Sequence, residues 1–187
     1  MIDLIREASG VQELLEKNGW KFCFIGGVAL LRWGEPRFTA DMDLSLLTGF
    51  GGEEKFVDTL LGSLKPRLPD MRNFALQNRI LLLWSKGNIP IDIALSGVQF
   101  EETMISSSTK FEFAQGYSLR TCGAEDLVVL KAFADREKDW EDVKGILVRQ
   151  GSRLRWDYVI QQLEQLCEVK GNKEIIKKLE KMKPLCR

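Results

Sequence analysis

FIGGVALLRWGEPRFTADMDLSLL, residues 24–47, is the stretch from which the fold of this chain can be inferred. From Arg37 onward, polar and apolar residues alternate one by one as far as Leu46. Because successive side chains of a strand point to opposite faces, the alternation predicts a strand whose apolar face packs on a core. Carboxylates aligned on one face repel each other unless positive charge lies between them, so the polar face suits a metal ion. That polar face consists of Arg37, Thr39, Asp41, Asp43 and Ser45.

A pair of glycines precedes this predicted strand. Residues 20–25 predict a short strand that ends at Gly26-Gly27, and residues 28–33 predict a short helix. Glycines at a strand-to-helix turn allow the backbone to approach a phosphate closely, and the N-terminus of the helix adds positive potential. The alternative is that the two glycines only form a tight turn.

The rest of the sequence predicts an α/β half followed by an all-helical half. Periodicity and turn residues predict helices over 3–17, 53–64 and 98–106, a hairpin of strands 79–85 and 89–95, and two short strands within 110–120. From Gly123 the pattern is helical in four segments: 123–134, 138–150, 156–167 and 172–182. We therefore predict an α+β protein, with a mixed β-sheet flanked by helices over 1–122 and a C-terminal helical bundle packed against it over 123–187.

The composition excludes several kinds of enzyme. The 187 residues contain no histidine, which rules out Ser-His-Asp and Cys-His mechanisms and zinc sites built on imidazole. The 27 basic and 27 acidic residues balance, so the chain as a whole is not attracted to nucleic acid. Four scattered cysteines, an N-terminus without a secretory pattern and the lack of a long apolar run predict a cytoplasmic protein with free thiols and no membrane partner.

The C-terminal segment is an exception to this balance of charge. From Lys170 to Arg187 there are seven basic residues against two acidic ones, Glu174 and Glu180. A basic helical face can bind RNA or DNA, and a solvated helix surface is the alternative.

The Asp41-Met42-Asp43 triplet carries little weight by itself, because with 27 acids in 187 residues such triplets arise about four times by chance. Its position after the glycine turn and on a polar strand face adds weight. A third acid, Asp92, lies between Ile91 and Ile93, where an unpaired carboxylate would be costly. Three carboxylates can hold two Mg²⁺ ions that are shared with substrate phosphates. For Asp92 the alternative is that its carboxylate forms a salt bridge.

These motifs together resemble the nucleotidyltransferase superfamily related to DNA polymerase β. The shared pattern is a glycine pair, thirteen residues, Asp-x-Asp, and a later apolar-Asp-apolar strand. The string GGVALLRWGEPRFTADMDLSL resembles the AbiEii-type branch found in toxin–antitoxin and phage-abortive systems. A second string, EDLVVLKAFADREKDWEDVKGIL, resembles the helical segment that follows the catalytic sheet in that branch. One departure is that many members of the superfamily carry Gly-Ser in place of Gly-Gly.

The resemblance implies roles for the central residues. Gly26 and Gly27 would hold the triphosphate, and Asp41, Asp43 and Asp92 would be the catalytic, metal-binding carboxylates. Asp92 is also the candidate base for the acceptor hydroxyl. The implied cofactor is Mg²⁺ or Mn²⁺, and the implied substrate is a nucleoside triphosphate (NTP).

Four further residues are candidates for nucleotide binding. Lys131 matches a lysine expected near the phosphates, and its alternative is a salt bridge to Asp135 at i+4. Asp139 is a candidate in the same helical block, where capping or a solvated face is the alternative. Arg37 and Thr39 would touch phosphate or orient the first aspartate of the pair, and Arg37 would otherwise neutralise the carboxylates.

The sequence therefore predicts a metal-dependent nucleotidyltransferase that transfers a nucleoside monophosphate to an acceptor hydroxyl. For a toxin-like component, the acceptor would be RNA, such as tRNA, or protein, and an antitoxin-like protein would be a partner. Two alternatives stay open: an antibiotic-type transferase that modifies a small molecule, and a non-catalytic nucleotide-binding regulatory module.

Overall fold

The computed structural model describes residues 1–186, which divide into two compact units. The first unit joins residues 1–28 to residues 38–122, and the second joins residues 29–37 to the chain from Gly123 onward. Helix α2 (Gly26–Trp33) begins in the first unit and ends in the second. Residues 29–37 therefore group with the helical half of the chain, although they precede the central strand in the sequence.

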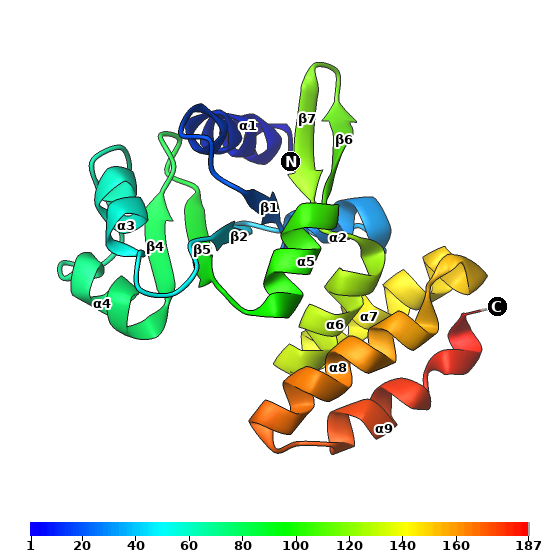
Figure 1. Cartoon of the computed structure of the whole chain (residues 1–187). Coiled ribbons are helices and arrows are strands. Elements are labelled where there is room, and N and C mark those ends of the chain that lie inside the picture. Colours follow the sequence, from blue (N-terminus) through cyan, green and yellow to red (C-terminus); the bar gives the residue numbers. More distant parts are fainter. Residues whose placement is uncertain (187) are drawn as a thin grey trace. The chain divides into compact units, whose positions relative to one another are not determined.

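The first unit is built on one mixed sheet of seven strands (Figure 1). Its order is β3-β4-β5-β2-β1-β7-β6, with parallel pairing of β2 to β5 and of β1 to β7 and antiparallel pairing elsewhere. The strands are β1 (Phe22–Phe24), β2 (Met42–Leu47), β3 (Lys65–Pro66), β4 (Ile80–Trp84), β5 (Pro90–Ser96), β6 (Thr109–Ala114) and β7 (Tyr117–Thr121).

Four helices pack with this sheet, namely α1 (Ile2–Lys17), α3 (Glu54–Leu61), α4 (Met71–Asn78) and α5 (Gln99–Ser107). Helix α1 buries the residues that recur at helical spacing in the sequence, including Leu4, Ala8, Val11 and Leu15. The apolar sides of β2 and β5 are fully or almost fully buried: Met42, Leu44, Leu46, Ile91, Ile93 and Leu95. These residues form the centre of the core of the first unit.

The predicted β4–β5 hairpin is confirmed. The two strands pair in antiparallel register, and the Ser85 N–H donates to the Ile89 carbonyl at 2.8 Å across the turn. Asn88 takes a left-handed conformation there, with φ of 59°, which asparagine tolerates better than most residues. Helix α4, in contrast, was not predicted, since Pro66 and Pro69 indicated only a break in the chain.

The predicted start of the central strand is wrong. Strand β2 begins at Met42, and Phe38, expected on the core face, is 83% exposed. The physical reason is that residues before Met42 have no ladder to join. Strand β1 pairs only with residues 44–46, and β5 begins at Pro90, which has no N–H to donate. The alternation over 37–41 therefore lies in a loop.

In its described residues after Gly123, the second unit contains four α-helices and two short 3-10 helices. They are α6 (Ala124–Ala134), α7 (Glu137–Gln150), η1 (Gly151–Arg153), α8 (Trp156–Lys170), α9 (Glu174–Glu180) and η2 (Lys183–Leu185). Its core is formed by buried apolar residues such as Leu127, Val143, Ile146 and Leu163. The segment after α2 is attached to α7 by two hydrogen bonds, because Arg149 and Gln150 donate to the carbonyls of Gly34 and Trp33 at 2.5 and 2.6 Å. Among the described residues, no helix combines the length and the apolar character that a membrane crossing requires.

The different environments of Leu44 and Phe38 predict different costs of substitution. Leu44→Ala should lower the free energy of unfolding by about 2–5 kcal/mol, because it leaves a cavity in the core. Phe38→Ala should change it by less than about 0.5 kcal/mol, because that side chain is mostly exposed. Urea unfolding followed by circular dichroism measures both. A large loss for Phe38→Ala would mean that the strand extends to residue 37 after all.

Candidate functional site

Asp43 and Asp92 lie side by side in the sheet, although 49 positions separate them in the sequence. They are direct register partners on the parallel strands β2 and β5. Neighbouring strands are about 4.8 Å apart, and register partners project to the same face. Their sequence neighbours, such as Met42 and Ile91, are buried on the other face. The sheet therefore presents two partly exposed carboxylates together, and their catalytic and metal-binding roles stay predictions.

Gly26 leaves room for the Asp43 carboxylate. Its φ is +54°, and a Cβ added there would lie 1.9 Å from Asp43 Oδ2. The Ile25 N–H donates to the Asp43 carbonyl at 2.9 Å, which holds the two segments together. Since Gly26 is the first residue of α2, the carboxylate also lies at the positive end of a helix. Glycine is thus required at position 26 because the Asp43 side chain approaches it closely.

Gly27 has a similar relation to Thr39. A Cβ at Gly27 would lie 2.2 Å from Thr39 Oγ1. The same hydroxyl donates to Asp41 Oδ1 at 3.0 Å. This hydrogen bond has the geometry by which Thr39 would orient Asp41, and both roles expected for Thr39 stay predictions. Asp41 itself is exposed and precedes β2.

Arg67 is a further candidate residue of this site that the sequence did not indicate. Its Nη1 donates to Asp92 Oδ1, and the two side chains are 28% and 31% exposed. The Arg67 N–H bonds to the carbonyl of Leu82, the residue of β4 that is in register with Asp92. The salt bridge considered as the alternative for Asp92 is therefore present. The isolation of Asp92 among apolar residues indicated that it needs a partner. Arg67 follows the two-residue edge strand β3, which is too short to show a periodic pattern, so the sequence did not identify Arg67 as that partner.

The three aspartates do not form a ready-made metal cluster. Within residues 1–186, no three acidic or cysteine side chains gather closely enough to hold an ion. Asp43 and Asp92 nevertheless offer neighbouring carboxylate oxygens, which are the ligands that Mg²⁺ prefers. The donor chemistry of this pair therefore suits a divalent cation, with further ligands still to be supplied.

The other predicted residues meet in the helical unit around an unpredicted acid, Asp142. Lys131 is 6% exposed, and its Nζ lies 3.0 Å from Asp139 Oδ1 and 2.7 Å from Asp142 Oδ2. Arg37 binds Asp142 through two parallel hydrogen bonds of 2.8 Å. Asp135, the partner considered for Lys131, instead accepts a hydrogen bond from Trp140 Nε1 at 2.7 Å. Asp139 and Asp142 are three residues apart on one helix, which is the signal that could have revealed this cluster.

The pKa values of Asp139 and Asp142 are both lower than usual. Burial by itself would raise each pKa, but neighbouring cations more than compensate. Arg136 and Lys131 stabilise the Asp139 carboxylate, and Arg37 and Lys131 stabilise that of Asp142. The cluster is therefore charged in the folded protein, with three cations around two carboxylates.

Several lysines of the basic segment have partners within the helical unit. Lys177 pairs with Glu174 at 2.7 Å, and Lys170 Nζ donates to the Phe133 carbonyl at 2.7 Å. Three ammonium groups lie over aromatic rings, at 4.8, 4.3 and 5.5 Å from the ring centroids: Lys170 over Phe133, Lys178 over Trp140 and Lys183 over Trp156. Much of this basic character is thus used in packing, and nucleic-acid binding by the segment stays a prediction.

The fold is similar to that of solved nucleotidyltransferase-like proteins. An antigenic nucleotidyltransferase-like protein from Paracoccidioides brasiliensis superposes with a TM-score of 0.53 at 14% identity, over 93% of this chain and 92% of that one. The lincosamide antibiotic adenylyltransferase LnuA, solved with lincomycin bound, gives 0.49 at 15% identity, over 75% and 94%. The antibiotic-resistance factor ANT(2'')-Ia gives 0.45 at 16% identity, over 98% and 89%.

No protein-family model matches the sequence, and no curated protein does. The structural likeness therefore concerns the fold. It confirms the predicted α+β class and its nucleotidyltransferase-like architecture. The AbiEii branch stays a prediction.

The contact between Gly26 and Asp43 can be tested with a matched pair of glycines. Gly26→Ala should destabilise the protein by about 1–3 kcal/mol more than Gly19→Ala, because only the first places a Cβ on a carboxylate. Both glycines have positive φ, so both variants carry the backbone cost of about 1 kcal/mol. Urea unfolding of the two variants gives the difference. Equal costs would show that the Asp43 side chain moves away freely.

The lowered pKa values predict acid sensitivity of the helical unit. A carboxylate whose pKa is lowered by folding contributes stability that is complete above its unfolded pKa of about 4 and is lost as the pH falls through the folded value. Asp142→Asn should lower the free energy of unfolding by about 3–5 kcal/mol near pH 7. The reason is that buried Lys131, and Arg37 beside it, lose a negative charge that compensates theirs.

When the pH falls from about 7 to about 3, Asp142→Asn should lose less stability than the unmodified protein. The reason is that it lacks one carboxylate whose pKa is lowered by folding. Urea unfolding at both pH values measures this. Glu141→Gln, an exposed change on the same helix, is the control and should leave the pH dependence nearly unchanged. Equal acid sensitivity of Asp142→Asn and the unmodified protein would contradict the assignment.

Proposed function

We propose that the chain is a metal-dependent nucleotidyltransferase that transfers a nucleoside monophosphate from an NTP to an acceptor hydroxyl. The observation that carries the proposal is the pairing of Asp43 with Asp92 on adjacent parallel strands of a nucleotidyltransferase-like fold. Two carboxylates this close favour a cation between them. The contact of Asp43 with Gly26 supports it further, because it holds one carboxylate at the turn where a phosphate would bind.

Asp43 and Asp92 would hold Mg²⁺ or Mn²⁺ together, with Asp41 or the substrate phosphates as further ligands. When bound, the metal would neutralise charge on the phosphates and on the leaving pyrophosphate. Thr39 would keep Asp41 in its orientation through the 3.0 Å hydrogen bond. Arg67 would release Asp92, whose carboxylate would then accept the proton of the acceptor hydroxyl.

The charged cluster of the helical unit supports a role in nucleotide binding. Arg37, Lys131 and Arg136 outnumber the carboxylates of Asp139 and Asp142, so the cluster has a net positive charge. Arg37 and Arg136 also keep 40% and 63% of their side chains exposed. Such groups attract phosphate oxygens. We therefore retain Arg37, Lys131 and Asp139 as proposed nucleotide-binding residues, with Asp139 acting through the two cations that it binds.

For the acceptor we propose RNA, such as a tRNA end, or a protein, in a toxin-like component that has an antitoxin-like partner. This part rests on the resemblance of residues 26–46 and 125–147 to the AbiEii-type branch. The lysines that stack on aromatic rings reduce the weight of the basic segment as a support for RNA.

The test is to incubate the protein with each radiolabelled NTP, Mg²⁺, and either total RNA or total protein. Transfer of label should fall at least about 100-fold in Asp43→Asn, because a metal ligand is lost. Asp3→Asn, an exposed acid of α1 in the same unit, should transfer normally. The proposal fails if no NTP is used with any acceptor, or if Asp43→Asn is as active as the unmodified protein.

Two other outcomes separate the alternatives. Transfer to a small-molecule hydroxyl, but not to RNA or protein, would identify an antibiotic-type transferase. Calorimetric binding of NTP with Mg²⁺ and no turnover would identify a non-catalytic module.

A further inference from the structure

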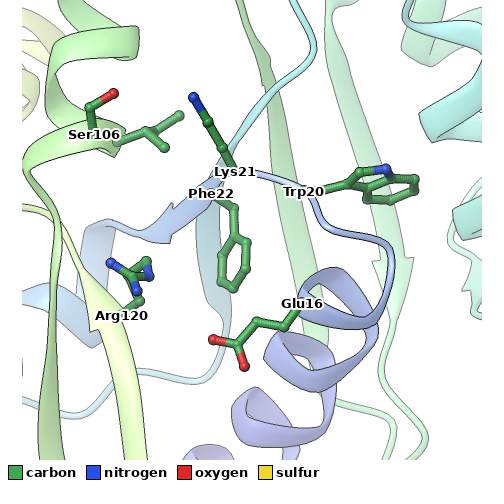
Figure 2. Close-up of a pocket in the computed structure, with 7 residues that line it drawn as sticks. Glu16, Trp20, Lys21, Phe22, Ser106 and Arg120 are labelled. Atoms are coloured by element: carbon green, nitrogen blue, oxygen red, sulfur yellow. The ribbon is translucent and has the colours of Figure 1, made fainter.

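A cavity lies in the first unit, away from Asp43 and Asp92. Its volume is about 410 Å³, within the range of small-molecule sites, and Figure 2 shows the residues that line it. It lies at the start of β1, where the Lys21 carbonyl accepts a hydrogen bond from Leu47 at the end of β2. At the other end of the β1–β2 pairing, Ile25 donates to the Asp43 carbonyl. Lys21 and Ile25 are four residues apart along the strand, so roughly 13 Å separates the cavity from Asp43.

Two cations and a hydroxyl border this cavity. In Figure 2, Lys21 and Ser106 lie on one side of it and Arg120 on another. In the described part of the chain, Lys21 makes no ion pair. Arg120 donates through Nη1 to the Ser108 carbonyl at 2.9 Å, which uses one of the five donors of its guanidinium. Most of the hydrogen-bonding capacity of both cations is therefore available to a ligand.

Glu16 also lines the cavity, but its charge is compensated. Lys110 lies 2.9 Å from Glu16 Oε1. Among the residues that line the cavity, Lys21 and Arg120 outnumber the single carboxylate of Glu16, so the lining has a net positive charge, which favours an anion.

The floor of the cavity is apolar. The Phe22 ring projects into the middle of the group in Figure 2, and both Phe22 and Ile105 are buried. The Trp20 ring points away from the other side chains and packs on Phe56, with the ring centroids 4.8 Å apart. Because Phe22 and Ile105 are only 2% and 4% exposed, an apolar group placed on them would gain mainly van der Waals contact, with a small contribution from burial.

We propose that this cavity binds a small organic phosphate, with its phosphate between Lys21 and Arg120 and its apolar body on Phe22 and Ile105. An ammonium, a guanidinium and the Ser106 hydroxyl offer donors from several directions, which suits a tetrahedral anion with three or four oxygens better than a planar carboxylate. The site is separate from the Asp43–Asp92 pair, so the proposal does not depend on nucleotide transfer.

The experiment is isothermal titration calorimetry of the full chain with phenyl phosphate as the probe. We expect one site, with weaker binding of both inorganic phosphate, which lacks the apolar body, and benzoate, which lacks the tetrahedral head. Lys21→Gln should weaken binding about tenfold, because a charge-assisted hydrogen bond is lost. Glu16→Gln should strengthen it a few-fold, because a negative charge is removed. The same titration with Asp43→Asn should give unchanged affinity.

Lys17→Gln is the matched control, since it removes the same charge from an exposed lysine of α1 that does not line the cavity. Its effect should be small because the charge acts through solvent. The proposal is overturned if phenyl phosphate does not bind at millimolar concentration, or if inorganic phosphate or benzoate binds as tightly. It is also overturned if Lys21→Gln matches Lys17→Gln, or if Asp43→Asn abolishes binding, which would locate the ligand at the carboxylate pair.

Discussion

The parallel register between β2 and β5 is the constraint on which the candidate site depends. It places the Cα atoms of Asp43 and Asp92 about 5 Å apart, and two unit charges at that separation repel by about 3 kcal/mol at the effective dielectric constant of a protein surface. On the opposite face, the same register buries six apolar side chains of the two strands, each worth about 1.5–3 kcal/mol. Burial therefore outweighs repulsion. A slip of β2 by one residue would turn over the side chains of that strand and place Asp43 in the core, so this alternative register is disfavoured.

The acids Asp139 and Asp142 differ from Asp92 in how cations neutralise them. Asp139 and Asp142 are almost fully buried, and Lys131 lies within salt-bridge distance of both. Removing or displacing one member of such a buried network is costly. Asp92 and Arg67 are each about a third exposed, and an ion pair of this kind contributes only about 0–1 kcal/mol. A divalent cation could therefore replace Arg67 at little cost, which makes the sheet pair the better candidate for binding a metal.

The parts of the structure that could be predicted are those with a local pattern. Alternation from Met42 to Leu46 gave the central strand, and the helical periodicity after Gly123 gave the second half of the chain. The start of the strand was missed because alternation continues into a loop, and a strand ends where its neighbours end. Arg67 and Asp142 were missed for a related reason. Their roles come from contacts across 25 and 105 positions with Asp92 and Arg37, and no local pattern encodes such contacts.

The contact between Gly27 and Thr39 explains why this chain has Gly-Gly where the motif has Gly-Ser. Many members of the superfamily that the sequence resembles carry serine where this chain has Gly27. Serine does not fit here while Thr39 keeps its position, because a Cβ at Gly27 would lie 2.2 Å from Thr39 Oγ1. The threonine hydroxyl thus occupies the space of a serine side chain, and it also donates a hydrogen bond to Asp41. Since Thr39 belongs to the loop before β2, the geometry of Asp41 depends on that loop, whereas Asp43 is held by the sheet itself.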